Sequence, residues 1–210
     1  MTIRKLVAYG TSAPRPSDLI VFGSDREIAR HYESGNSSKP FTVTRGSIAQ
    51  SLGIRSQNAH VGAHTDPQMT KVEIDLLQIE YRTERPTDPI LHLVVAGSLS
   101  IQHRSPLSTF LILSNSGIFR GRDMLPRAHP NDGFVDVLAI DRNINLRQRA
   151  LAWHRSKTGW HLPHPQLQVS RAVEHQWSGR PSNMIADGVL IRDVAWLKCT
   201  VLADALSIYL

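Results

Sequence analysis

The sequence is poor in cysteine and in long apolar runs. Its single cysteine, Cys199, cannot form a disulfide within the chain, which excludes a disulfide-stabilised scaffold and predicts a buried thiol in a reducing compartment. No run approaches the roughly 18 consecutive apolar residues of a membrane-spanning helix, and the residues after Met1 lack the apolar core of a signal peptide. We therefore expect a cytoplasmic protein without a transmembrane segment.

Acidic residues are fewer than basic ones. The chain carries 24 Lys and Arg against 18 Asp and Glu, a net charge of +6, and its isoelectric point is near 9.9. This balance favours phosphate-bearing small ligands or lipid headgroups and allows peripheral contact with an acidic membrane, although it also serves solubility. Nucleic acid is not an expected partner, because the arginines are scattered over residues 82–192 and rarely alternate with aromatics.

The 210 residues, 41% hydrophobic and 20% charged, suffice for one or two folded domains. Residues 1–57 show the alternation of strands and helices that is typical of an α/β domain. Strands are expected at residues 18–22 and 41–43, and helices begin at Ser24 and Ser47 with capping boxes to Glu27 and Gln50.

Residues 58–210 show a different pattern, in which short strands are separated by turns and a single helix is expected at Leu146–Arg155. The expected strands are 72–81, 90–101, 109–113, 134–140, 167–170, 172–177, 184–191, 196–201 and 206–209. So many short strands favour a β-sandwich-like domain, whose last strand we expect to return to the first domain.

One segment carries a specific motif. Asn115-Ser116-Gly117 is followed by Arg120-Gly121 and then by the run LPRAHPNDGFVDV, residues 125–137. This order resembles the Asn-Gly, Pro-x-Ala and Asp-Asp-Gly-Leu-Leu-Asp-Val elements of diacylglycerol kinases and related bacterial lipid kinases, and its wording is closest to an actinobacterial branch. Near the C-terminus, residues 186–189 (ADGV) are similar to the family's Asp-Gly-Glu element.

The resemblance implies a fold like that of NAD kinase and diacylglycerol kinase, in which an α/β domain that holds ATP precedes a β-rich domain. The family's first phosphate loop reads Asp-Leu-Ile-Val-x-Gly-Gly-Asp-Gly-Thr, and the matching stretch here is DLIVFGSDRE. Gly23 and Asp25 are kept, whereas Ser24, Arg26 and Glu27 replace two glycines and the threonine. A side chain at Arg26 obstructs the approach of backbone N–H groups to a phosphate, and Glu27 adds a carboxylate there.

The second phosphate loop of the family, Gly-Thr-x-Asn-Asp, falls on residues 43–47. Thr44 is kept, but Gly46 and Ser47 replace the Asn-Asp pair. The chain also begins one or two strand-helix units into the family's first domain. We therefore expect residues 1–57 to be a truncated remnant of the nucleotide-binding domain, with ATP binding weakened or lost.

The resemblance also implies roles for residues of the β-rich domain. Asp187 matches the base that takes the proton of the lipid hydroxyl, although Asp187-Gly188 equally fits a tight turn between two strands. The family's structural Mg²⁺ site maps onto the backbone oxygens of His129 and Phe134 and the carboxylate of Asp132. A metal-free β-turn at residues 130–133 is the alternative there.

Three arginines surround the motif segment: Arg120, Arg122 and Arg127. Guanidinium groups in such a cluster bind an anionic headgroup, or they form a solvated rim. The sequence supports both interpretations.

These observations lead to one main hypothesis and two alternatives. The main hypothesis is a lipid-kinase-like protein with impaired or absent ATP-dependent phosphoryl transfer, which binds a ligand or a partner. The first alternative is an active ATP-dependent kinase that phosphorylates a lipid hydroxyl such as that of diacylglycerol. The second is a chain completed by a protein partner or a second copy of itself, whose exposed sheet edge would promote a homodimer or a complex.

Overall fold

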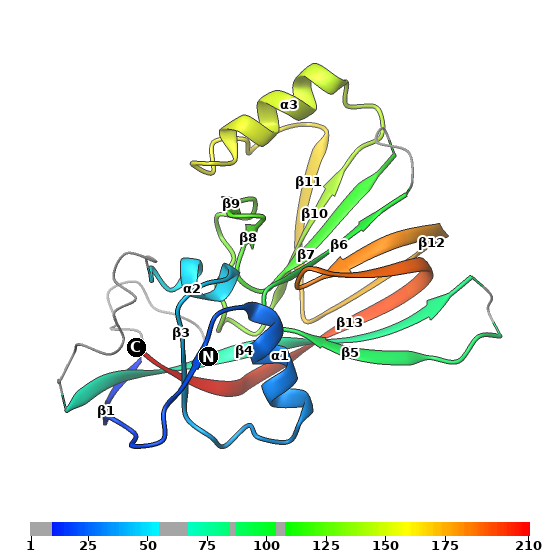
Figure 1. Ribbon diagram of the computed structural model, residues 1–210. Coiled ribbons are helices and arrows are strands. Elements are labelled where there is room, and N and C mark those ends of the chain that lie inside the picture. Colours follow the sequence, from blue (N-terminus) through cyan, green and yellow to red (C-terminus); the bar gives the residue numbers. More distant parts are fainter. Residues whose placement is uncertain (1–9, 55–66, 85–86, 104–107) are drawn as a thin grey trace.

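The computed structural model describes residues 10–54, 67–84, 87–103 and 108–210 (Figure 1). Its main element is one 11-stranded, mostly antiparallel sheet, in which neighbouring strands follow the order β1-β4-β13-β12-β6-β7-β10-β11. β5 pairs with β4, β3 pairs with the end of β13, and β2 pairs with β3. β8 and β9 form a separate two-stranded sheet.

The strands are β1 (Thr11–Pro14), β2 (Ile20–Phe22), β3 (Phe41–Val43), β4 (Gln68–Thr83), β5 (Leu91–Val95), β6 (Ser98–Gln102), β7 (Phe110–Ser114), β8 (Ile118–Phe119), β9 (Arg122–Asp123), β10 (Val135–Ile140), β11 (Leu167–Ala172), β12 (Glu174–Ala186) and β13 (Val189–Tyr209). The helices are α1 (Asp25–Glu33), α2 (Ser47–Ser51) and α3 (Leu146–Arg155). The predicted strand at residues 41–43 and the predicted helix at Leu146–Arg155 are confirmed in every residue.

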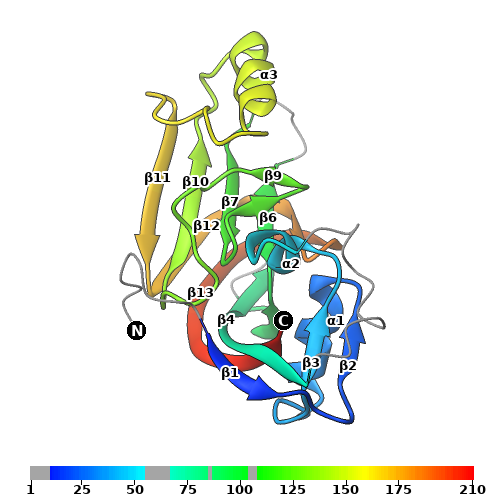
Figure 2. The same cartoon turned by 90° about the vertical axis from the view of Figure 1, so that its left-hand side faces the viewer.

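β4 and β13 form the spine of the molecule. They have 16 and 21 residues and pair antiparallel along most of their length. Leu77 and Cys199 belong to a core that the curled sheet encloses between β4, β6, β7, β10, β12 and β13, which confirms the burial expected for the thiol. Ile74 and Ile208 belong to a second core, which packs under α1 and α2. One pair of strands therefore stabilises both cores (Figure 2).

The first core lies within one continuous sheet rather than between two separate sheets. We expected two packed layers, whereas the strands around this core are joined edge to edge in one continuous sheet. The register shifts between Ser178 and Ser182 in β12 and between Leu202 and Leu206 in β13 mark bulges. Bulges increase the twist of a strand, which allows a single sheet to curl around its own core.

The N-terminal corner is a small α/β unit. β2 and β3 run parallel and are connected by α1, which buries Ile28 and Ala29 against them. The end of β13 joins this unit, because Ile208 pairs in parallel with Phe41 of β3. The domain boundary predicted after residue 57 lies outside the described residues.

Four of the predicted strands have the wrong extents. The stretch 90–101 is two strands, β5 and β6, separated at Ala96-Gly97. The stretch 184–191 contains a hairpin turn at Asp187-Gly188, whose φ angles of 43° and 83° lie in the left-handed region. The stretches 196–201 and 206–209 are parts of the single strand β13. In each case apolar periodicity continues across a turn or a bulge, which periodicity alone does not reveal.

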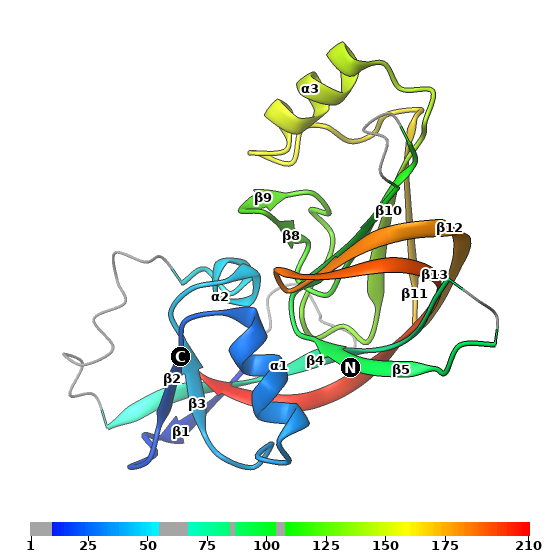
Figure 3. The same cartoon turned by 45° about the vertical axis from the view of Figure 1, so that its right-hand side comes forward.

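α3 lies over one end of the sheet, far from α1 (Figure 3). A third cluster of buried residues fills the space between this end of the sheet and the β8–β9 region, and Ile112, Phe119 and Leu138 are among its members. None of the helices within the described residues is long and apolar enough to cross a membrane.

Candidate functional site

Asp187 occupies the first position of the tight turn between β12 and β13. Its carboxylate accepts three backbone hydrogen bonds from the break between β5 and β6: Oδ2 from Ala96 N–H at 2.7 Å, and Oδ1 from Gly97 and Ser98 N–H at 3.1 and 3.0 Å. The residue therefore lies in the tight turn that the sequence suggested, its carboxylate is fixed, and its role as the base stays a prediction. The three N–H groups hold it in one orientation.

Asp25 supplies a second fixed carboxylate. It lies in the first turn of α1, and its Oδ2 and Oδ1 accept hydrogen bonds from Ser47 and Ile48 N–H at 2.7 and 3.1 Å. α2 has Gly46 at its N-cap and no side-chain cap of its own, so the capping box predicted between Ser47 and Gln50 is wrong. Asp25 satisfies the free N–H groups of α2 from another element instead.

The two carboxylates approach each other across Gly97. A Cβ atom on Gly97 would lie 2.8 Å from Asp25 Oδ2 and would also collide with the Ser47 hydroxyl. Burial, together with the negative charge of Asp25, raises the pKa of Asp187 to about 7, against the opposing effect of its three N–H donors. Asp187 is consequently a carboxyl group that can gain or lose a proton near neutral pH.

This pair of carboxylates opens into a cavity of about 420 Å³, which Asp25, Gly46, Ser47, Asp187 and Arg120 help to line. A second cavity of about 230 Å³ lies under α3 and has mostly apolar walls. The two share Phe119 and Arg120, so they meet at the β8–β9 hairpin. A polar cavity with two carboxylates is thereby adjacent to an apolar one.

Other residues expected at the nucleotide site have structural partners. Ser24 caps α1 by accepting from Glu27 N–H at 3.3 Å, and the Glu27 carboxylate accepts from Gly23 N–H at 2.6 Å. The Arg26 guanidinium lies 3.7 Å from Glu33, and the Thr44 hydroxyl donates to the carbonyl of Phe22 on β2 at 3.2 Å. The first loop is therefore held by its own side chains.

The three predicted anion-binding arginines are not brought together. Arg120 borders the carboxylate cavity and stacks over Phe119. Arg122 donates to the carbonyl of Trp153 at 2.8 Å and stacks on that ring, which attaches α3 to β9. Arg127 borders a different cavity. Arg120 is the one of the three that lies beside Asp187.

The predicted magnesium ligands His129, Asp132 and Phe134 lie in the turn before β10. The Asp132 carboxylate accepts from Phe134 N–H at 3.1 Å and pairs with Arg171, which also bonds Asp136 at 3.2 Å. A carboxylate already neutralised by a guanidinium is a poor ligand for a divalent cation. In the described part of the chain no three His, Cys, Asp or Glu residues gather as metal ligands. Asp132 is paired with Arg171 in this structure, and magnesium at this turn stays a prediction.

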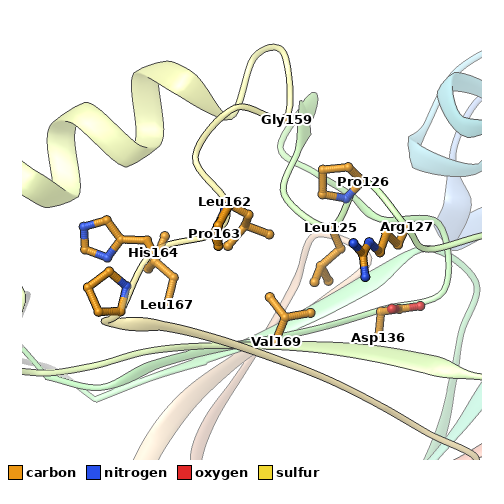
Figure 4. Close-up of a pocket in the computed structure, with 11 residues that line it drawn as sticks. Leu125, Pro126, Arg127, Asp136, Gly159, Leu162, Pro163, His164, Leu167 and Val169 are labelled. Carbon is orange, nitrogen blue, oxygen red and sulfur yellow. The ribbon is translucent and has the colours of Figure 1, made fainter.

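A further cavity, of about 710 Å³, lies apart from the two carboxylates. Figure 4 shows Leu162, Pro163 and His164 on one side of it and Leu125 and Val169 on the other. Most of its walls are apolar or proline. It therefore offers room for an apolar group rather than a reactive centre.

Sequence reasoning missed the residues that fix the Asp187 carboxylate. Ala96, Gly97 and Ser98 fell inside a predicted strand, although a glycine within a strand pattern often marks a close approach of another group. Asn115, from the motif segment, is buried and donates to the carbonyls of Asp75 and Ala96 at 2.6 and 3.3 Å. This motif residue thus connects β4 to the break between β5 and β6, where Asp187 is held.

The fold, a curled antiparallel sheet with a small α/β corner, has counterparts among solved structures. A diacylglycerol kinase structure from Bacillus anthracis matches it with a TM-score of 0.61 and 11% sequence identity, over 91% of this chain and 77% of the other. A second structure, also described as a diacylglycerol kinase of that organism, matches with a TM-score of 0.51 and 9% identity over the same shares.

This chain therefore has the fold of the diacylglycerol kinases, and the resemblance inferred from its motifs is confirmed at the level of fold. No protein-family model matches the sequence. A search of curated proteins also finds no match.

Proposed function

We propose that this chain binds a lipid that carries a free hydroxyl group, and that its ATP-dependent phosphoryl transfer is impaired or absent. The observation that carries the proposal is the position of the Asp25 carboxylate between the N-terminus of α2 and Asp187. In that position Asp25 accepts the hydrogen bonds of the Ser47 and Ile48 N–H groups, which a phosphate would otherwise accept. Its negative charge also acts on Asp187, the carboxylate that would accept a hydrogen bond from the lipid hydroxyl.

An ATP phosphate does not fit the two loops as they are arranged. The N–H groups of Ser47 and Ile48 donate to Asp25, and that of Gly23 donates to Glu27. A phosphate would have to displace these carboxylates and would be repelled by their charge. We expect calorimetric titration with Mg-ATP to give no binding in the micromolar range, and micromolar binding would overturn this part of the proposal.

The lipid part of the proposal rests on the two adjoining cavities. A hydroxyl group placed in the carboxylate cavity lies beside Asp187, while the apolar chain of the same molecule extends past Phe119 into the cavity under α3. Asp187 then accepts the hydroxyl hydrogen bond, and Arg120 lies at the junction of the two cavities. The diacylglycerol kinases that share this fold make diacylglycerol the first lipid to test.

Two alanines of α3 provide a matched test. Ala152 lines the cavity under α3, whereas Ala150 lies on the exposed face of the same helix. We expect Ala152→Phe to weaken the binding of a short-chain diacylglycerol about tenfold or more, because the ring fills the cavity, and Ala150→Phe to leave the affinity unchanged. Equal affinities in both variants would contradict the proposed binding site.

An active lipid kinase is the second candidate. The observation that favours it is the pKa of Asp187, which burial raises to about 7 and which therefore suits a general base at neutral pH. Transfer of labelled phosphate from ATP to diacylglycerol, lost in Asp187→Asn, would establish this candidate. No transfer by the unmodified protein, at saturating lipid, would remove it.

A further inference from the structure

The excess positive charge of the protein is concentrated in one segment. Residues 142–173 contain six Lys and Arg and no Asp or Glu, so the other 178 residues carry 18 basic and 18 acidic side chains. Arg149 and Arg171 bond groups within the protein. The other four side chains are exposed and make no ion pair with a described residue: Arg142, Arg147, Arg155 and Lys157.

The same segment exposes large apolar side chains. Trp160 is 80% exposed, Leu146 64% and Leu151 46%. α3 buries none of its residues completely: Arg149 and Ala152 are half-buried, and Trp153 is 37% exposed. Exposed tryptophan and leucine side chains gathered among cations in one short segment are unfavourable in water and mark an interaction surface.

The position of this surface connects it to the cavities. α3 and the loop that follows it form one end of the molecule (Figures 1 and 3). Gly159, Leu162 and Pro163, on either side of Trp160 in sequence, wall the cavity of about 710 Å³. Trp153 and Ala152 of α3 wall the cavity that adjoins the carboxylates. A molecule held at this surface therefore lies next to both apolar cavities.

We propose that residues 146–165 dock the protein on an anionic lipid bilayer. Trp160 and Leu151 enter the interfacial region, where amphipathic and apolar side chains are stabilised, and Arg147, Arg155 and Lys157 contact headgroup phosphates. A bilayer surface is the partner that satisfies both features, because a nucleic acid gives no apolar environment to leucine side chains. The docking does not depend on the proposed function. Only the further step, in which a lipid of the bilayer reaches the carboxylate cavity, rests on the proposed function.

Co-sedimentation with vesicles tests the docking. We expect the full chain to bind vesicles that contain phosphatidylglycerol at least about tenfold more tightly than vesicles of pure phosphatidylcholine, and the binding to weaken as salt is added. The double variant Trp160→Ser/Leu151→Ser and the double variant Arg147→Glu/Lys157→Glu should each lose about tenfold in affinity. Val21→Ser and Arg192→Glu, exposed residues on β2 and β13, are the matched controls and should bind like the unmodified protein.

Three outcomes would overturn the docking proposal. They are no binding to phosphatidylglycerol vesicles, equal losses in the variants and their controls, and binding of a polynucleotide through the same residues with none to vesicles. The test is separate from that of the proposed function. Short-chain diacylglycerol binding without vesicle binding would refute the docking alone, and vesicle binding without binding of the short-chain lipid would refute the proposed function alone.

Discussion

At the scale of single residues, the site depends on a glycine and two aspartates. Gly97 lets the break between β5 and β6 pass between Asp25 and Asp187, so both carboxylates are held by backbone N–H groups in a small space. Two carboxylates in such an environment resist being charged together. The proton that Asp187 can gain or lose near neutral pH is therefore the chemically useful feature of the site.

The pKa of Asp187 predicts a pH dependence of stability. Burial raises this pKa from 3.8 to about 7, so the folded protein holds the proton more tightly than the unfolded chain does. The contribution of Asp187 to the free energy of unfolding is therefore full at acidic pH and is lost as the pH rises from about 4 to about 7, on the order of 2–4 kcal/mol. Thermal unfolding of the unmodified protein and of Asp187→Asn across this range measures it.

The free energy of unfolding of Asp187→Asn should depend less on pH than that of the unmodified protein. The two proteins should differ most in stability above pH 7. Asp25→Asn should move the midpoint to lower pH, because it removes the charge that helps to raise the pKa of Asp187. If stability changed with pH in the same way in the unmodified protein and in Asp187→Asn, the raised pKa of Asp187 would be contradicted.

Gly97→Ala should destabilise the protein by about 1–3 kcal/mol, because the new Cβ meets the Ser47 hydroxyl and Asp25 with no room to move. Gly23→Ala is the matched control. A Cβ there finds its nearest atom, Glu27 Oε2, at 3.8 Å, and we expect a change within about 0.5 kcal/mol. Denaturant unfolding of both variants compares them, and similar midpoints would count against the close approach.

At the scale of elements, charged side chains act as connectors between segments that are distant in sequence. Asp25 of α1 caps α2, which has only five residues and no cap of its own. Asp75 of β4 accepts from Gly133 N–H at 2.7 Å and from Asp204 N–H at 2.9 Å, and so joins the turn before β10 to the bulge of β13. These connections fix loops that carry or border the site.

Arg171 is the connector most open to a direct test. It pairs with Asp136, which is buried, and with Asp132, so Arg171→Gln leaves a buried carboxylate without a partner. We expect a loss of about 2 kcal/mol, less than for a fully buried pair because the guanidinium is 40% exposed. Chemical denaturation provides the measurement.

Lys198→Gln provides the control for Arg171→Gln. Lys198 pairs with Glu174 at 2.9 Å on the exposed surface of the sheet, where an ion pair contributes little. The expected change is within about 0.5 kcal/mol. A loss in Lys198→Gln as large as that in Arg171→Gln would refute the special role of the buried carboxylate.

At the scale of the whole molecule, stability depends on the long β4–β13 pair. Both cores include residues of β4 and β13. The loss of either core would therefore also disrupt the part of the β4–β13 pair that belongs to it. β2 and β11, in contrast, each pair with only one other strand and lie at the edges of the sheet. The fold should therefore open from its edges.

Hydrogen exchange should follow this arrangement. We expect the amides of residues 72–79 and 196–201, in the middle of the β4–β13 pair, to exchange slowest, and those of residues 167–172 in β11 to exchange at least about tenfold faster under native conditions. Exchange followed by mass spectrometry reports both regions in one experiment. Equal protection of β11 and the β4–β13 pair would contradict this view of the sheet.

Much of the secondary structure was predictable because it depends on local rules. The capping box of α3 and the apolar run of β3 lie within single segments, and both elements have the expected bounds. The cap of α2 was not predictable in this way, since the carboxylate that provides it comes from a different helix. Asp187 was predicted as a site residue through its motif, but the partners Ala96, Gly97 and Ser98 were not.

Most strand and helix positions, the concentration of positive charge in residues 142–173 and the resemblance to the diacylglycerol kinases follow from the sequence alone. These depend on residue type and on spacing along the chain. The tertiary structure alone decided that the sheet is one continuous ladder and that Asp25, Gly97 and Asp187 meet. Strand pairing joins segments that are far apart in sequence, and only once they are joined do burial and the nearby charge set the pKa of Asp187.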